Sequence, residues 1–177
     1  MERRLSSRRI YEGRILSLRV DEVEVSRNGR HAHREVVEHG SAVAILARDD
    51  QGHLLFVKQF RYPPGAELLE IPAGLMESGE SPQESAQREL REETGYRAGS
   101  WTELPPIWST PGFSDEKLFL FFAEQLEWAP LEQDEDEDIA LVRMTESEAR
   151  ALLDSTQAQD AKTMFALAWY LDRKSVV

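Results

Sequence analysis

The stretch that most constrains this chain of 177 residues is residues 74–96, which read GLMESGESPQESAQRELREETGY. Its second half has the marks of a helix with defined ends. Ser81 suits the N-cap and Pro82 the first helical position, and Glu84, three residues after the cap, completes a capping box. Gly95 is a suitable stop. We therefore predict a helix that begins after the serine cap and ends at the glycine.

Three carboxylates lie on one face of this predicted helix. Glu89, Glu92 and Glu93 are spaced i, i+3 and i+4, which makes them neighbours on the helix surface. Like charges this close repel each other, so the face is either solvated by water or occupied by a hard cation. Mg²⁺ prefers carboxylate oxygens and keeps waters and substrate phosphates as its other ligands. Charge runs on helices are usually solvated, so the spacing of these three residues alone leaves both alternatives open.

The wider pattern favours the cation. Gly74, five residues, Glu80, seven residues and then RELREETGY over residues 88–96 resemble the signature of the Nudix hydrolases, with Tyr96 at its last bulky apolar position. The resemblance implies a hydrolase that cleaves a diphosphate linked to another moiety. It also implies Mg²⁺ as cofactor, with Mn²⁺ as an alternative. The implied fold is an α/β Nudix-type α/β/α sandwich with a mixed central sheet and an N-terminal antiparallel β-extension.

Three further stretches indicate a subgroup within this family. Residues 57–61 (VKQFR), 71–74 (IPAG) and 109–116 (STPGFSDE) are similar to segments of the ADP-ribose pyrophosphatases. In that subgroup a proline follows the last glycine of the signature by sixteen residues, and Pro111 lies sixteen residues after Gly95. The resemblance therefore implies hydrolysis of ADP-ribose to AMP and ribose 5-phosphate.

Two alternatives to this function remain. Residues 20–40 contain no aromatic residue other than histidine, whereas some relatives hold adenine between aromatic rings there. Another nucleoside diphosphate sugar, for example GDP-mannose, is therefore the alternative substrate. A non-catalytic Nudix domain that binds a nucleotide and regulates a partner is the second alternative. Such domains tend to lose signature carboxylates and to carry an added module; here the signature is intact, and we expect no such module.

Matching positions assign the metal site. The resemblance implies four oxygen donors, which are the carboxylates of Glu89, Glu92 and Glu93 and the backbone carbonyl of Ala73. Arg88 stands four residues before Glu92, so we expect it to hold the helix glutamates in place rather than to touch substrate. Glu92 is also a candidate catalytic carboxylate.

The implied substrate contacts lie outside the helix. Arg61 would pair with a phosphate or the terminal ribose through its planar fork of donors; the alternative is a solvated residue at a loop tip. The backbone around Gly112 and the carboxylate of Glu116 would contact the phosphate and ribose side of the pocket. Three N-terminal residues match positions that hold adenine across a dimer interface, namely Ile15, Arg34 and Glu35.

The general base is expected in an acidic tract. In ADP-ribose hydrolases this base usually comes from an acidic loop rather than from the signature helix, and residues 132–138 (EQDEDED) occupy the matching place. Glu137 is our first choice and Glu135 the second. The alternative for either residue is a plain solvated charge.

The rest of the chain is consistent with one domain, residues 1–177. Residues 10–39 alternate apolar and other residues around Asn28-Gly29, which favours an antiparallel hairpin. The resemblance implies that residues 1–39 are a β-extension that pairs two subunits; the alternative is an extension that covers the edge of its own core. Further strands are expected at 41–47, 53–60, 67–71, 101–108, 117–122 and 139–144. Two C-terminal helices follow, the first with the Thr145/Glu148 capping box and the second with Asp160 as N-cap.

Composition excludes several classes of protein. The formal net charge of −12 argues against a nucleic-acid partner, which would require a basic patch. The chain has no cysteine, so thiolate catalysis and Cys-zinc sites are excluded. It has neither a signal-peptide pattern nor a run apolar enough to span a bilayer, so we expect no membrane partner. The expected location is the cytoplasm.

Overall fold

The fold is taken from a computed structural model, which describes residues 1–132, 138–155 and 160–174. In this described part the chain forms three helices, α1 (Pro82–Thr94), α2 (Glu146–Leu153) and α3 (Ala161–Lys174). The strands in the same part are β1 (Glu2–Glu12), β2 (Leu16–Val25), β3 (Arg30–His39), β4 (Ala42–Arg48), β5 (Leu54–Arg61), β6 (Ala66–Glu70), β7 (Ala73–Leu75), β8 (Tyr96–Glu103), β9 (Ile107–Trp108), β10 (Lys117–Trp128) and β11 (Ile139–Met144).

The chain divides into two compact units. We call Met1–Ser41 with Trp108–Lys117 the sheet unit, and Ala42–Ile107 with Leu118–Val177 the sandwich unit. The expectation that residues 1–177 form one domain stays a prediction. None of the helices in the described residues is both long and apolar enough to cross a membrane.

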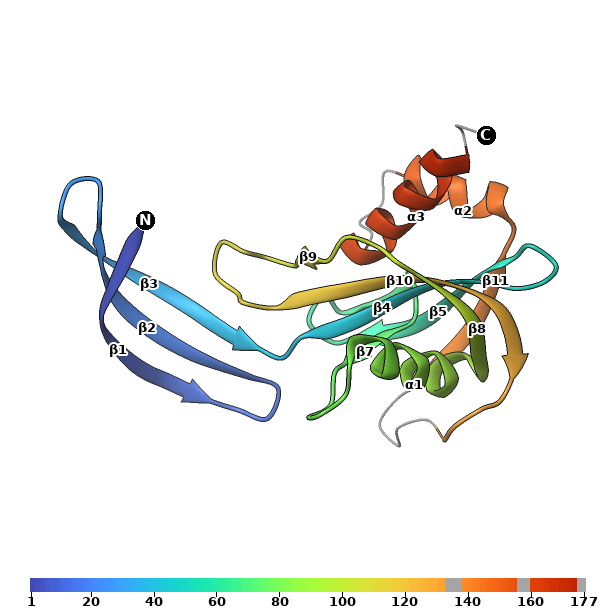
Figure 1. The fold of residues 1–177 in the computed structure, drawn as a ribbon, viewed down its shortest axis with the longest axis horizontal. Helices are drawn as coiled ribbons and strands as arrows, with labels where there is room; N and C mark the ends of the chain where they lie inside the picture. Colours follow the sequence, from blue (N-terminus) through green and yellow to red (C-terminus); the bar gives the residue numbers. More distant parts are fainter. Residues whose placement is uncertain (133–137, 156–159, 175–177) are drawn as a thin grey trace. The chain divides into compact units, whose positions relative to one another are not determined.

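The sandwich unit has the expected three layers. Its central sheet runs in the order β11-β5-β4-β10-β8, with β10 parallel to β4 and the other pairs antiparallel. Figure 1 shows α1 on one face of this sheet and α2 and α3 on the other. Side chains of β4 alternate between the faces, because successive residues of a strand point to opposite sides. Val43 and Ile45 pack with Leu90 of α1, whereas Leu46 packs with Leu167 of α3. The predicted fold class is confirmed.

The ends of α1 are as predicted. The hydroxyl of Ser81 accepts a hydrogen bond from the backbone of Glu84, whose carboxylate accepts one from the backbone N–H of Ser81 at 2.8 Å. Gly95 ends the helix at φ 80°, in the left-handed region that favours glycine. A Cβ atom at Gly95 would also overlap the ring of Trp128 on β10. Two separate constraints therefore require glycine at this position.

One predicted strand is wrong. Residues 101–108 do not form a single strand, because β8 begins at Tyr96, directly after the helix, and ends at Glu103. Pro105 and Pro106 follow, and proline has no N–H to donate to a sheet. Only the short β9 resumes the pairing, along β10.

The sheet unit contains the predicted N-terminal antiparallel sheet, in the order β1-β2-β3. The sheet is larger than the alternation of residues 10–39 indicates, since β1 begins at Glu2. The turn between β2 and β3 has four residues, because Val25 pairs with Arg30, and Gly29 adopts φ 66°. Residues 109–116 belong to this unit as well: the backbone N–H of His39 donates to Asp115 Oδ1 at 2.8 Å.

Candidate active site

Two carboxylates of α1 are buried against β7. Glu93 is 3% exposed and Glu89 is 9% exposed. The Oε2 atom of Glu93 accepts a hydrogen bond from the backbone N–H of Ala73 at 3.0 Å. Burying a carboxylate is costly unless hydrogen bonds or cations compensate. These contacts bring together three of the residues expected to hold a metal, namely Ala73, Glu89 and Glu93.

Gly74 makes this approach possible. A Cβ atom built at Gly74 would overlap the carboxylate of Glu89. The requirement for glycine here comes from this close approach of helix and strand, since Gly74 is not among the residues with positive φ. The first fixed position of the signature thus has a direct steric reason.

Replacing Gly74 by alanine is expected to displace the Glu89 carboxylate and lower kcat/KM on the order of 10²-fold, as small misplacements of reacting groups do. Gly99→Ala is the matched control, because its Cβ would meet the flexible end of the Gln125 side chain at 3.2 Å. Steady-state kinetics and thermal unfolding check both variants. A folded Gly74→Ala protein with the kinetics of the Gly99→Ala control would contradict the steric argument.

Arg88 holds three carboxylates of the signature. Its Nη1 donates to Glu89 Oε1 at 2.7 Å and to Glu92 Oε2 at 2.9 Å. Its Nε and Nη2 donate to Glu80 at 2.9 and 3.0 Å, and Nη2 also donates to the carbonyl oxygen of Leu75 at 3.0 Å. These hydrogen bonds lower the pKa of Glu80 to about 2 and raise the pKa of Arg88. The contacts agree with the expectation that Arg88 positions the helix glutamates.

The donor chemistry of this region fits a hard cation. In the described residues, no group of three or more acidic or histidine side chains converges on one point that a metal ion can occupy. Oxygens of Glu89 and Glu92 accept hydrogen bonds from Arg88 instead. Glu80, Glu89 and Glu92 nevertheless place three carboxylates around the guanidinium of Arg88, and Glu93 adds a fourth on α1. This excess of carboxylate oxygens is the ligand set that Mg²⁺ prefers.

Arg61 lies at the end of β5 and pairs with Glu70 at the end of β6. Its Nε donates to Glu70 Oε1 at 2.7 Å and its Nη2 to Oε2 at 3.0 Å. Lys162, near the start of α3, donates to the same Oε2. Burial opposes ionisation of Glu70, which is 2% exposed, but Arg61 and Lys162 outweigh it and hold the Glu70 pKa below its ordinary value. Arg61 is thus an ordered residue rather than a solvated loop tip.

The remaining candidate substrate residues lie in the sheet unit. Ile15 is 56% exposed, between β1 and β2. Arg34 donates to Glu2 on β1, at 2.5 Å from Nη2, and Glu35 is exposed. As consecutive residues of β3, these two point to opposite faces of the sheet. Their assignment to an adenine site stays a prediction.

Two more candidates of the sheet unit belong to residues 109–116. Gly112 is exposed, and no atom lies within 4 Å of where its Cβ would be. The Oε1 atom of Glu116 lies 3.5 Å from His39 Nδ1. Both assignments stay predictions. Glu137 and Glu135, the candidate bases, lie outside the described residues.

The sequence argument missed Glu70 and Lys162. The signal at Glu70 is an acidic residue between apolar neighbours, Leu69 and Ile71, directly before the signature. Such a residue needs a buried cation as partner. The partner on α3 is 92 residues away, and no local pattern reveals it.

Comparison with known proteins shows the family of this chain. A family model described as "NUDIX domain" matches residues 38–167, and one described as "Nucleoside diphosphate sugar hydrolase N-terminal domain" matches residues 2–37. The chain therefore belongs to the Nudix family and is a Nudix hydrolase.

Individual relatives are similar over nearly the whole chain. The chain is 41% identical to an ADP-ribose pyrophosphatase of Bacillus subtilis (strain 168), over 99% of this chain and 95% of that protein. It is 36% identical to a methanol dehydrogenase activator of Bacillus methanolicus, over 95% of this chain and 91% of that protein. Among solved structures, "Crystal structure of ADP compounds hydrolase" is similar with a TM-score of 0.84 and 26% identity, covering 99% of this chain and 97% of that chain.

Proposed function

We propose that this Nudix hydrolase cleaves the diphosphate of ADP-ribose to AMP and ribose 5-phosphate, with Mg²⁺ as cofactor and Mn²⁺ as a substitute. The observation that carries the proposal is the buried pair Glu89 and Glu93 against β7: Gly74 leaves room for the Glu89 carboxylate, and the backbone N–H of Ala73 donates to Glu93. Full-length similarity to an ADP-ribose pyrophosphatase supports the choice of substrate. We also propose a cytoplasmic location, which suits a chain without cysteine.

The metal site would consist of Glu89, Glu92, Glu93 and the carbonyl oxygen of Ala73. When bound, the metal supplies positive charge to the diphosphate and lowers the pKa of a water. Arg88 would keep Glu89 and Glu92 on the same side of α1 and, through its hydrogen bonds to Glu80, stay in place while those two carboxylates turn to the cation.

Other residues would orient the substrate and accept the proton. Arg61 would bind a phosphate or the terminal ribose through its guanidinium. Gly112 and Glu116 would contact the same part of the substrate. Glu137 would take the proton from the attacking water, with Glu92 as a second candidate catalytic carboxylate.

We further propose a homodimer in which Ile15, Arg34 and Glu35 of one subunit contact the adenine bound to the other. Every residue of β1 is exposed, and in the β1-β2-β3 sheet only Asp21 and Val23 are buried, both on β2. Ile10 and Tyr11 are large apolar residues exposed on this sheet. A sheet that buries so little of its own surface favours pairing with another chain.

The full-length protein is expected to sediment as a dimer at micromolar concentration. Ile10→Asp places a charge among exposed apolar residues, so it is expected to shift the protein toward monomer and to raise KM for ADP-ribose. Arg27→Asp, in the exposed turn between β2 and β3, is the control. A wild-type monomer that hydrolyses ADP-ribose normally would remove the N-terminal residues from the site.

The two alternative functions, a different sugar substrate and a non-catalytic regulator, can be separated by measuring turnover. Another nucleoside diphosphate sugar, such as GDP-mannose, would use the same carboxylates. A panel of nucleoside diphosphate sugars assayed with Mg²⁺ discriminates by kcat/KM, and we expect ADP-ribose to be highest. A regulator that binds nucleotide without turnover would bind ADP-ribose and release no product. Higher kcat/KM for GDP-mannose, or binding without turnover, would contradict the proposed function.

A further inference from the structure

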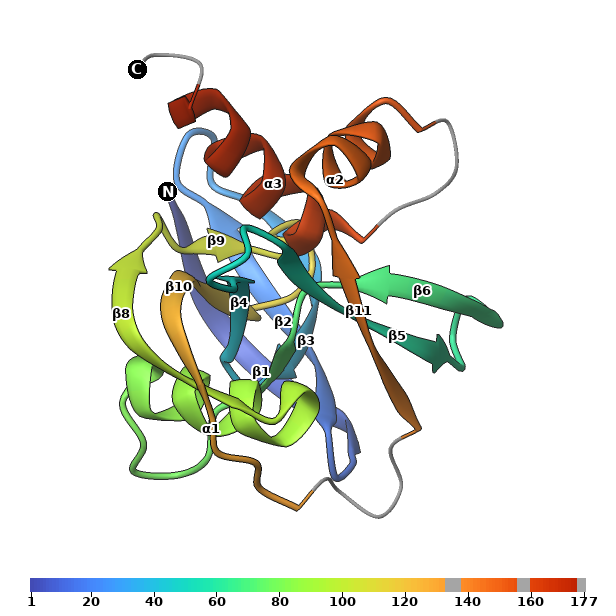
Figure 2. The ribbon, with the colours of Figure 1, turned by 90° about the vertical axis from the view of Figure 1, so that its right-hand side faces the viewer.

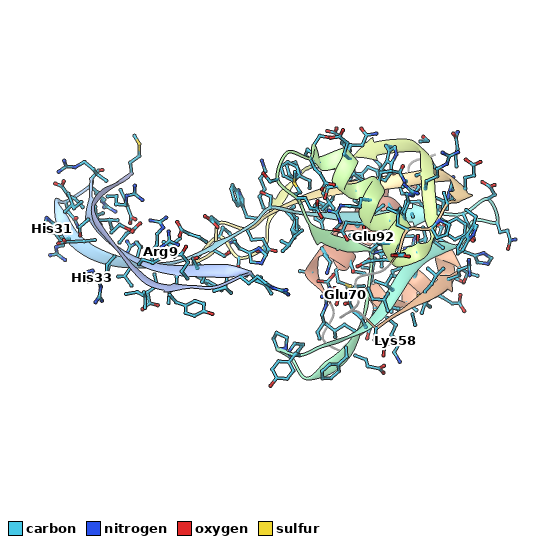
Figure 3. The ribbon with its side chains drawn as sticks, turned by 90° about the horizontal axis from the view of Figure 1, so that it is seen from below. Arg9, His31, His33, Lys58, Glu70 and Glu92 are labelled. Atoms are coloured by element: carbon cyan, nitrogen blue, oxygen red, sulfur yellow. The ribbon has the colours of Figure 1, made fainter. Side chains whose placement is uncertain are left out.

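Glu70 is a buried acid that receives two cations from separate elements. Arg61 comes from β5, whereas Lys162 comes from α3. Figure 2 shows β5 and β6 as a hairpin at the edge of the sandwich unit, with β11 alongside β5. In Figure 3, Glu70 and Lys58 are labelled at this hairpin, and Glu92 on α1. The carboxylate therefore joins the hairpin to the start of α3.

The start of α3 is itself fixed to the strand that leads into the signature. The backbone N–H of Ile71, next to Glu70, donates to Thr163 Oγ1 at 2.9 Å. Asp160 accepts from the backbone N–H of Thr163 at 3.0 Å and lies 3.1 Å from Lys162 Nζ. Lys162 thus contacts both Asp160 and Glu70.

The hydrogen bonds to Glu70 use one edge of the Arg61 guanidinium. A guanidinium has five N–H groups in a rigid fork. In the described residues, the bonds to Glu70 come from Nε and Nη2, so the edge that carries Nη1 is turned away from this carboxylate. The side chain is 38% exposed. The Arg61 pKa is raised by the hydrogen bond to Glu70 and also by the charge of Glu93 on α1.

A second cross-strand ion pair on the same hairpin provides a contrast. Lys58 on β5 and Glu67 on β6 approach to 2.7 Å, but their side chains are 48% and 61% exposed. Exposed pairs of this kind order their side chains little. On this hairpin, Arg61 therefore differs from Lys58 in that its acidic partner is buried and is shared with a second cation, Lys162.

We propose that Glu70 is a positioning residue that fixes the Nε edge of Arg61 so that its Nη1 edge faces a phosphate or ribose oxygen of the nucleoside diphosphate substrate, and that Lys162 holds Glu70 in place. This inference rests on the proposed function. Immobilising a long side chain at binding costs affinity, so a pre-ordered arginine binds more tightly. Loss of this ordering is expected to cost about tenfold in KM.

The test compares Glu70→Gln and Glu70→Asp with the control Glu67→Gln, using the full chain, ADP-ribose and saturating Mg²⁺. We expect Glu70→Gln to raise KM about tenfold and to change kcat by less than about threefold. The control is expected to leave both constants unchanged. Glu70→Asp keeps the charge between Arg61 and Lys162 but shortens the arm, so it is expected to raise KM as well.

A double-mutant cycle separates positioning from a general structural effect. Once Arg61→Ala has removed the guanidinium, Glu70→Gln is expected to cause no further rise in KM, because Glu70 acts through Arg61. A merely structural effect would instead add to that of Arg61→Ala and would accompany a fall in the midpoint of thermal unfolding.

Four results are decisive. An unchanged KM in folded Glu70→Gln, or additive losses in the cycle, would overturn the positioning role. If Glu70→Gln does not fold, Glu70→Asp takes its place, and a wild-type KM in that variant would also overturn the positioning role. If the wild-type protein is inactive on ADP-ribose, the proposed function fails instead, and the same variants are measured on the substrate of the panel that the wild type does cleave.

Discussion

Glu93→Gln is expected to lower turnover of ADP-ribose by about 10³-fold or more, because a metal ion contributes several kcal/mol of transition-state stabilisation and a neutral amide replaces one of its charged ligands. The fold is expected to survive, since the amide oxygen of glutamine can still accept the hydrogen bond from the backbone N–H of Ala73. Stopped-time assays at limiting Mg²⁺ measure the effect, with circular dichroism and thermal unfolding as checks of folding.

The matched control for this prediction is Glu127→Gln on β10. Glu127 forms an ion pair with Arg97 at 2.6 Å, and its side chain is 68% exposed. Its replacement removes one negative charge without touching the carboxylates of α1. Unimpaired turnover by folded Glu93→Gln at limiting Mg²⁺ would remove the metal site from α1.

Glu137→Gln is expected to slow the chemical step on the order of 10²- to 10⁴-fold, the range for loss of a general base. Metal and substrate are expected to bind as in the wild type, because the residue is not among the proposed metal ligands. Single-turnover kinetics isolate the chemical step, and calorimetric titration of ADP-ribose into the variant measures binding.

Glu135→Gln is the companion variant for that experiment. Both residues belong to the acidic tract before β11, so the two variants change the net charge equally. If Glu135→Gln shows the large fall and Glu137→Gln does not, the tract supplies the base from the other residue. If neither variant is impaired, the base lies elsewhere and Glu92 becomes the first candidate.

The parts of the fold that sequence predicts are those with local causes. Both ends of α1 follow from contacts within four residues, namely the Ser81 capping box and the glycine stop. The same holds for α2, where Thr145 and Glu148 form the predicted capping box, and for the N-cap Asp160 of α3. β11 has the predicted bounds.

The parts that sequence does not predict depend on distant contacts. β1 is rich in arginine and serine, without the alternation of a half-buried strand, and its pairing depends on β2. The site shows the same division. The spacing of Glu89 and Glu93 can be read from one helix, whereas the pairing of Glu70 with Lys162 joins elements 92 residues apart.

The steric role of Gly74 belongs to both categories. Its place in the signature is visible in the sequence, but the reason for a glycine appears only when β7 lies against α1 and the Glu89 carboxylate occupies the space of the missing side chain. By contrast, the substrate contacts predicted in the sheet unit, such as Glu35 and Glu116, rest on the resemblance to the ADP-ribose pyrophosphatases and stay predictions.

The most direct test of the central claim is product analysis of purified wild-type protein incubated with ADP-ribose, with and without Mg²⁺. We predict AMP and ribose 5-phosphate in equal amounts, resolved by chromatography, and no product after chelation of the metal. Intact ADP-ribose in the presence of Mg²⁺, or equal product formation with the chelator, would contradict the assignment of the α1 carboxylates to a metal-dependent ADP-ribose hydrolase site.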